Sequence, residues 1–133
     1  MANQDSAAAP HLQLSRFADD LLKYTYDIVQ KFPKAERFAL TESIKKRTDE
    51  AVYFSVCIAS YFDRHNREEL LRRMYVEIKT LERYVKVAYD CKYITPQNYE
   101  AWTKKLVNIG NILVGWLRKI EAGKSKTDYE KPA

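Results

Sequence analysis

Glycine and proline are scarce in this chain of 133 residues, which contains three glycines and four prolines. All-β folds need many turn residues, because each strand connection reverses the direction of the backbone. The scarcity therefore argues against an all-β fold and favours a few long helices. Apolar residues make up 46% of the chain, enough to bury one continuous core. The length suits a single domain of about 100–150 residues.

Cysteine is also rare, and Cys57 and Cys91 lie far apart without the spacing of a CxxC motif. Two unpaired thiols are typical of proteins from a reducing compartment. The first ten residues lack the basic and apolar regions of a secretory signal peptide. No apolar run approaches the roughly 18–20 residues of a membrane span. We therefore expect a soluble, cytoplasmic protein that does not associate with a membrane.

The motifs of the common enzyme classes are missing as well. There is no phosphate-binding GxxxxGK[ST] loop and no GxGxxG turn. A nucleophile–base pair needs a positioned histidine or lysine beside a serine or cysteine; of the only two histidines, His11 lies in the predicted disordered arm, and His65 has no serine or cysteine at helical spacing. Metal centres in helical bundles use Glu-x-x-His pairs, but Phe62 stands three positions before His65. We predict a non-catalytic protein without metal or cofactor, with a metal-dependent nuclease as the minor alternative.

Four segments have the apolar spacing of helices. In the first, apolar residues recur every three or four positions from Leu14 to Ile28, and Pro33 ends the segment. The second is predicted to run from Thr41, as its N-cap, to about Arg64. The third is predicted from about Arg67 to Lys92. Its core positions form an unbroken heptad pattern, namely Leu71, Met74, Ile78, Leu81, Val85 and Ala88.

The fourth segment begins at Thr95-Pro96, a cap residue followed by proline at the first helical position. Its apolar heptad positions run from Tyr99 to Ile120, and Gly123 is predicted to end it. Four such helices with short connections predict an all-α fold, an antiparallel up-down four-helix bundle. The predicted organisation is a disordered N-terminal arm at residues 1–11, the bundle at residues 12–123 and a disordered C-terminal tail at residues 124–133.

Positive charge exceeds negative charge, since 23 lysines and arginines face 18 acidic residues. The net charge of +5 favours an acidic or polyanionic partner. On the third helix, four residues share an outward face about 20 Å long; this basic stripe consists of Arg72, Lys79, Arg83 and Lys86. A solvated face without a partner explains the same pattern equally well. The full set predicted to bind nucleic acid or a polymerase is Lys45, Lys46, Arg47, Arg64, Arg67, Arg72, Arg73, Lys79, Arg83 and Lys86.

Aromatic residues are numerous, with ten tyrosines in the chain. Four aromatic side chains fit core positions, namely Tyr24, Tyr99, Trp102 and Trp116. The remaining tyrosines do not all fit one buried face, which suggests a protein interface. Gly110 and Gly115 lie inside the fourth helix, where each costs about 1 kcal/mol relative to alanine. Together with Trp116 they are predicted to mark close packing against another helix or another subunit; simple tolerance of glycine is the alternative.

Three stretches together resemble a known family. Phe32–Thr41 reads FPKAERFALT and resembles the "FPk-x-eRf-x-L" link between the first two helices of a bacterial four-helix-bundle superfamily. Asn108–Leu117 reads NIGNILVGWL and resembles the "eIGrmLgGWl" signature of one branch, the accessory variability determinant proteins of diversity-generating retroelements. Here Asn111 replaces a basic residue and Val114 replaces a glycine of that signature. Ile94–Tyr99 resembles the "ls-x-x-qYe" helix start of the same branch, and the similarity covers Leu12 to Gly123.

A sister branch, the ribosomal RNA intervening-sequence proteins, carries "Sip-x-NiaEG" in its second helix. This chain reads SVCIAS at Ser55–Ser60, without the Glu-Gly pair, which favours the retroelement branch. The resemblance implies a homopentameric barrel of bundles with a basic surface, no catalytic residues, a reverse transcriptase partner, and association with RNA or DNA during mutagenic copying. The alternative function is a structural oligomer or protein adaptor of the intervening-sequence type, without a nucleic-acid role.

Overall fold

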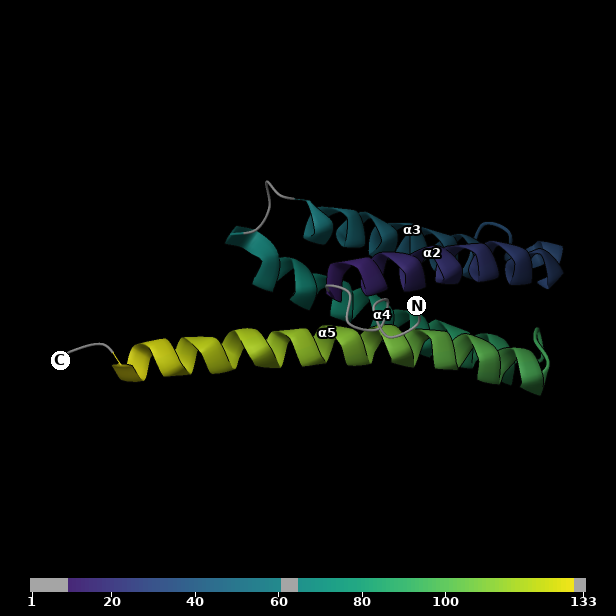
Figure 1. Cartoon of the computed structure of the whole chain (residues 1–133). Coiled ribbons are helices and arrows are strands. Elements are labelled where there is room, and N and C mark those ends of the chain that lie inside the picture. The colour runs from purple at the N-terminus through teal and green to yellow at the C-terminus, as the bar shows by residue number, and fades with distance from the viewer. Residues whose placement is uncertain (1–9, 61–64, 131–133) are drawn as a thin grey trace, which may run out of the picture.

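A computed structural model describes residues 10–60 and 65–130 of the chain, with side chains up to Lys124. These residues form four α-helices and no strand (Figure 1). The helices are α2 (Pro10–Ile28), α3 (Leu40–Ala59), α4 (Arg67–Asp90) and α5 (Pro96–Glu130). The predicted all-α fold is confirmed.

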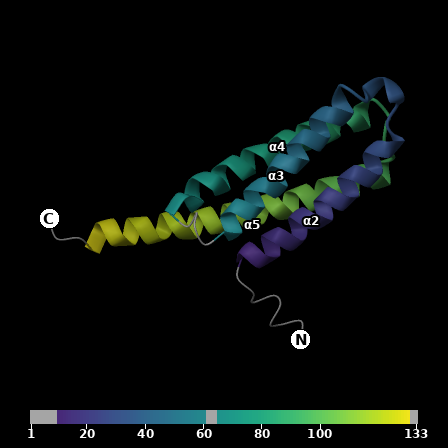
Figure 2. The same cartoon turned by 90° about the horizontal axis from the view of Figure 1, so that it is seen from above.

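Consecutive helices run in opposite directions, as the views in Figures 1 and 2 both show. Each helix packs against its neighbours in the sequence, and α5 closes the arrangement by packing against α2. The result is the predicted antiparallel up-down bundle. The outward face of each helix is left available to solvent or to partners.

The core follows the apolar spacing of the sequence. All six heptad positions of α4 are completely buried, from Leu71 to Ala88. On α5, Trp102 and the next three heptad positions are also completely buried, whereas Tyr99, Trp116 and Ile120 are half-buried against the core. The indole Nε1 of Trp102 donates a hydrogen bond of 3.2 Å to the hydroxyl of Thr25 on α2. The one polar atom of the largest core side chain therefore has a partner, as burial requires.

The link between α2 and α3 consists of two short 3₁₀ turns, η1 (Val29–Lys31) and η2 (Lys34–Glu36). Phe32, between them, is buried and packs near the rings of Tyr93 and Trp102, with centroid distances of 5.5 and 6.3 Å. The hydroxyl of Tyr93 donates a 2.6 Å hydrogen bond to Glu36 of η2. These contacts hold the link against the loop that joins α4 to α5.

Two predicted helix starts have different outcomes. The amide of Asn98 donates to the hydroxyl of Thr95 at 3.1 Å, so the predicted cap of α5 is confirmed. Thr41 is wrong as the N-cap of α3, because the helix begins one residue before it. The link enters α3 almost directly: Ser43 donates to the carbonyl of Ala39 at 2.9 Å, and the amide of Leu40 lies 3.5 Å from the carboxylate of Glu36.

The helix ends also differ from the prediction. α3 ends at Ala59, where Ser60 turns into extended backbone, and the predicted end at Arg64 lies outside the described residues. α4 ends at Asp90 instead of Lys92, whose φ of 65° is incompatible with a right-handed helix. α2 begins at Pro10, so residues 10 and 11 of the predicted arm are helical. The rest of that arm lies outside the described residues.

The largest difference concerns α5, which continues through Gly123 to Glu130. Gly123 does not adopt the positive φ of a helix-ending glycine, and its neighbours Glu121, Ala122 and Lys124 are good helix formers. At 1.5 Å per residue α5 is about 52 Å long, and its yellow end projects beyond the other helices in Figure 1. Residues 124–130 of the predicted tail are therefore helical. No helix in the described residues is long and apolar enough to cross a membrane.

Candidate nucleic-acid and partner surfaces

The basic stripe lies on the solvent side of α4. Its four side chains are exposed, whereas the heptad positions that precede three of them are buried in the core. This arrangement follows from the helical period, because one residue corresponds to about 100° of rotation. The stripe is therefore accessible along its length to a large ligand.

Three of the four cations in the stripe are paired with acids of the same helix. The distances are 3.0 Å for Arg72–Glu68, 3.1 Å for Lys79–Glu82 and 2.7 Å for Lys86–Asp90. Lys79 donates a hydrogen bond to Glu82 and Lys86 donates one to Asp90, and these hydrogen bonds raise the pKa of both lysines. α4 contains six basic and five acidic residues. The stripe is thus less positive than its basic residues alone suggested.

Arg83 has no ion pair among the described residues. With Lys86 it lines a surface hollow of about 470 Å³ between α4 and α5. Tyr99 also lines this hollow, and its ring stacks on that of Tyr89 with 4.3 Å between centroids and 12° between planes. Glu82 lines the hollow as well, so the end of the stripe near the α4–α5 loop combines one cation without an ion pair in the described part of the chain, Arg83, with an aromatic surface.

Two of the predicted binding residues take part in contacts between helices. Arg47 on α3 pairs with Glu77 on α4 at 3.1 Å, and the charge of Glu77 raises the pKa of the Arg47 guanidinium. Arg67 donates a 3.0 Å hydrogen bond to the carbonyl of Ile58 in the last turn of α3, and its guanidinium lies 5.2 Å from the ring centroid of Trp116. Binding a phosphate at Arg67 would disrupt these contacts.

The remaining predicted cations lie in several places. Lys45 has its ammonium group 4.9 Å from the ring centroid of Tyr26, while Lys46 is exposed. Arg73 is exposed, with its guanidinium 5.8 Å from the ring centroid of Phe54. Arg64 lies outside the described residues. Lys45 and Lys46 belong to the first turns of α3, next to the link, and Lys46 shares a hollow with Glu77 and Tyr84 of α4.

The link carries three exposed residues that sequence reasoning missed, namely Lys34, Arg37 and Phe38. Lys34 and Arg37, together with Lys45, line a hollow of about 340 Å³. Phe38 is 83% exposed, the highest value among the large apolar residues that the structure describes. We name these four residues, Lys34, Arg37, Phe38 and Lys45, the link surface. The sequence signal for the link surface was the local excess of positive charge, which helical periodicity does not detect.

Gly110 and Gly115 on α5 are not required by packing in the described part of the chain. A Cβ at the buried Gly110 would lie 4.0 Å from the Tyr75 ring, an ordinary contact distance, and a Cβ at the exposed Gly115 would meet nothing within 4 Å. Trp116 is half-buried against the core. Within the described residues, neither position needs a glycine for packing against a neighbouring helix, and close packing against another subunit stays a prediction.

The functional groups that the described residues offer lie on the surface of the bundle. Among the residues with described side chains, no group of three or more His, Cys, Asp or Glu could hold a metal ion. His65 is exposed, and both cysteines carry free thiols. The features that remain for function are exposed cations, exposed aromatic rings and shallow hollows, which are typical of proteins that bind other macromolecules.

Fold and surface together define a small four-helix-bundle protein whose outer faces carry exposed cations and aromatic rings. A family model described as bAvd-like, for bacterial accessory variability determinant, matches residues 12–120. The chain therefore belongs to the bAvd-like family, and the family resemblance seen in the sequence is confirmed. Members of this family are accessory proteins. No curated protein matches the chain.

Proposed function

We propose that this protein is the non-catalytic accessory protein of a diversity-generating retroelement. In this role it binds the reverse transcriptase and nucleic acid through basic surfaces of an oligomeric ring, and so supports mutagenic reverse transcription. The observation that carries the proposal is the match to the bAvd-like family over residues 12–120. The protein works in the reducing cytoplasm, in keeping with its two free thiols.

The electrostatics of the basic stripe support a nucleic-acid role. Ion pairs between exposed side chains contribute little to stability, so a phosphate can replace the carboxylate partner at small cost. Nucleic acids also gain affinity from the release of counterions when lysine and arginine approach the backbone. Arg83 and Lys86 are the first candidates, because they share one hollow with Tyr99 and Arg83 has no ion pair among the described residues.

Exposed apolar side chains support assembly with other chains. Tyr53 and Val56 on α3 and Val76 and Val87 on α4 are large apolar residues with exposed side chains. Exposed apolar surface of this kind is common where proteins associate. In a closed ring, one patch of each subunit meets a different patch of the next subunit, and the exposed Gly115 offers room for such an approach. We expect five subunits, as the family resemblance implies.

One observation favours a second candidate, a structural oligomer or protein adaptor without a nucleic-acid role. The six basic residues of α4 are nearly balanced by five acidic ones, and three members of the stripe already have carboxylate partners. A surface of this kind also serves solubility alone. Salt-dependent binding separates the two candidates.

The test is fluorescence anisotropy with a structured RNA and a DNA duplex while salt rises from about 50 to about 200 mM. The double variant Arg83→Gln/Lys86→Gln is compared with Arg16→Gln/Lys23→Gln, which removes the same charge from the exposed face of α2. We expect the slope of log affinity against log salt to fall by about two for the first variant and to stay unchanged for the second. Equal slopes contradict a role for the stripe, and no binding by the unaltered protein favours the adaptor.

A further inference from the structure

Most of the net positive charge of the chain is found around the link between α2 and α3. The segment from Val29 to Arg47 contains six basic residues and two acidic residues, a net charge of +4 out of a total of +5. The six are Lys31, Lys34, Arg37, Lys45, Lys46 and Arg47. This segment, more than the basic stripe, is therefore where the chain attracts an anion.

Of the two acidic residues in this segment, Glu42 is exposed and does not line the hollow, while Glu36 accepts hydrogen bonds. Glu36 accepts the Tyr93 hydroxyl at 2.6 Å through one carboxylate oxygen, and its other oxygen lies 3.5 Å from the amide of Leu40. Asp49 accepts the hydroxyl of Tyr26 at 2.9 and 3.0 Å. No carboxylate is among the described residues that line the 340 Å³ hollow. The three cations at the hollow, Lys34, Arg37 and Lys45, therefore have no acidic partner there.

The hollow has the dimensions of a small ligand site. Its volume of about 340 Å³ falls in the common range of roughly 300–1,000 Å³ for ligand pockets. Val29, Phe32 and Pro33 supply the apolar part of the lining. The basic side chains of the lining belong to the link and to the first turns of α3. Lys45 is positioned by the Tyr26 ring, 4.9 Å from its ammonium group. A phosphate with an attached apolar or aromatic group would satisfy both kinds of lining.

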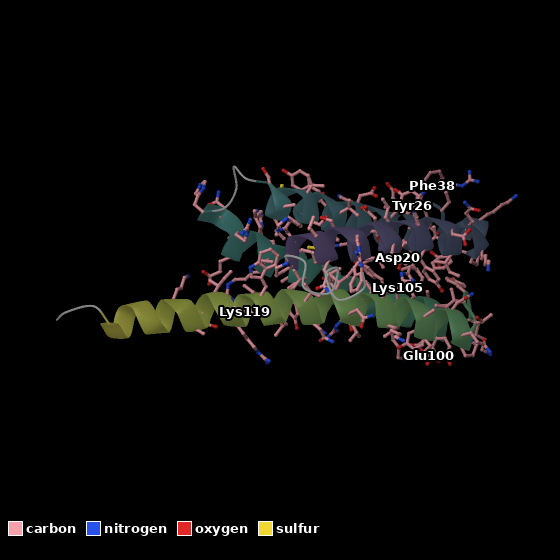
Figure 3. The ribbon with its side chains drawn as sticks, viewed as in Figure 1. Asp20, Tyr26, Phe38, Glu100, Lys105 and Lys119 are labelled. Atoms are coloured by element: carbon pink, nitrogen blue, oxygen red, sulfur yellow. The ribbon has the colours of Figure 1, made fainter. Side chains whose placement is uncertain are left out.

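The two phenylalanines of the link have opposite environments. Phe32 is 7% exposed and anchors the link against Tyr93, whereas Phe38 is 83% exposed. Figure 3 labels Phe38 and Tyr26 toward the same end of the bundle, with Phe38 on the outside. Phe38 directly follows Arg37, one of the cations of the hollow. An exposed aromatic ring next to cations is the combination on which bases of single-stranded nucleic acids stack.

We propose that the link surface binds single-stranded nucleic acid, with backbone phosphates at Lys34, Arg37 and Lys45 and a base stacked on Phe38. The proposal rests on the proposed nucleic-acid role and adds to it a site and a strand type. A duplex keeps the faces of its bases stacked internally, so it offers phosphates but no free base for Phe38. A single strand supplies both groups at successive nucleotides. An acidic protein segment is the competing occupant.

The experiment uses the full chain and labelled single strands of about twelve uridines or thymidines, within the roughly 4–16 nucleotides of known single-strand sites. Phe38→Ala should weaken binding about tenfold, while Phe38→Trp should retain it. Lys34→Gln/Arg37→Gln should lower the salt slope by about 1.4, at about 0.7 per phosphate of a single strand. The controls are Val56→Ala, an exposed apolar side chain on α3, and a duplex of the same length, whose binding should not respond to Phe38→Ala.

The outcomes separate this inference from the proposed function. Binding of either strand that depends on Phe38 supports the site, and the uridine and thymidine probes then distinguish RNA from DNA. Duplex or structured RNA binding without single-strand binding, or single-strand binding unaffected by Phe38→Ala, overturns the link site but leaves the proposed function standing. If the protein binds no nucleic acid at all, both the link site and the proposed nucleic-acid role are overturned. Binding of a glutamate-rich peptide that depends on Phe38, without binding of the strands, assigns the surface to a protein partner and overturns the proposal.

Discussion

Tyr93 and Glu36 meet across 57 positions of the sequence, where the Tyr93 hydroxyl donates a 2.6 Å hydrogen bond to the Glu36 carboxylate. The contact joins the α2–α3 link to the loop between α4 and α5. Phe32 packs beside it, 5.5 Å from the Tyr93 ring between centroids. All four helices are thereby connected at one end of the bundle, and the link surface is built on a fixed base.

Replacing Tyr93 by phenylalanine tests this contact through pH. The hydrogen bond to Glu36 stabilises the neutral phenol and raises the pKa of Tyr93 to about 12 from an ordinary value of 10.0. A raised folded-state pKa contributes stability that is present below about pH 10 and is lost as the pH rises through about 12. The stability difference between the unaltered protein and Tyr93→Phe should therefore be constant up to about pH 10 and shrink above it. Urea unfolding at stepped pH measures it, and a difference that does not change with pH would refute the contact.

The hydrogen bond inside the core gives a second prediction. Thr25→Val keeps the shape of the side chain but leaves Nε1 of the completely buried Trp102 without its acceptor. A buried donor without a partner costs about 1–3 kcal/mol, so the free energy of unfolding should fall by that amount. The control is Thr25→Ser, which retains the hydroxyl and should be less destabilising than Thr25→Val. Equal losses in urea unfolding would mean that the methyl group matters and the hydrogen bond does not.

Replacing an arginine that joins two helices should lower the free energy of unfolding more than replacing an exposed arginine. Arg67→Gln removes the donor to the Ile58 carbonyl and the contact with Trp116, and it should cost about 1–3 kcal/mol of unfolding free energy. Arg72→Gln removes an exposed pair within one helix and should leave stability unchanged within error. If Arg67→Gln also left the free energy of unfolding unchanged, Arg67 would be available to bind a phosphate.

Lys92 offers a stabilising substitution. Its φ of 65° lies in the left-handed region, and the amides of Tyr93 and Lys92 donate to the carbonyls of Ala88 and Tyr89 at 2.9 Å. This is the hydrogen-bond pattern of a helix end that usually carries glycine. Lys92→Gly should stabilise the protein by about 0.5–1 kcal/mol, since relieved strain of about 1–2 kcal/mol exceeds the added entropy of the unfolded chain. Lys92→Ala keeps the strain and should not raise the melting temperature; a similar rise in both variants would contradict this explanation.

The fold was predictable from the sequence because apolar spacing decides which helix face is buried. The heptad positions of α4, Leu71 through Ala88, are buried without exception, and Thr95 caps α5 as its residue type indicates. Helix ends were less predictable, because they depend on contacts from elsewhere in the chain. Glu36 lies near the first amide of α3 in place of a threonine cap. Gly123 continues a helix because its neighbours favour one.

The surfaces were only partly predictable. Helical period placed the basic stripe on the outer face of α4, and the four-residue spacing of Glu68–Arg72 and Lys86–Asp90 also allows these pairs to be predicted, although the prediction counted only the basic residues. Phe32 and Phe38 are the same residue type within one short link, and only tertiary packing shows that Phe32 is the anchor and Phe38 is exposed. Periodicity cannot resolve a link without a period, and for this reason Lys34, Arg37 and Phe38 were missed, whereas Lys45 on α3 was predicted.

The most direct test of the proposed function is the light-scattering mass of the purified protein, with and without a structured RNA, at low and at moderate salt. We expect a mass near five chains of 15.7 kDa that gains RNA at low salt and releases it as salt rises. A monomer or dimer whose mass does not respond to RNA would contradict a nucleic-acid-binding ring.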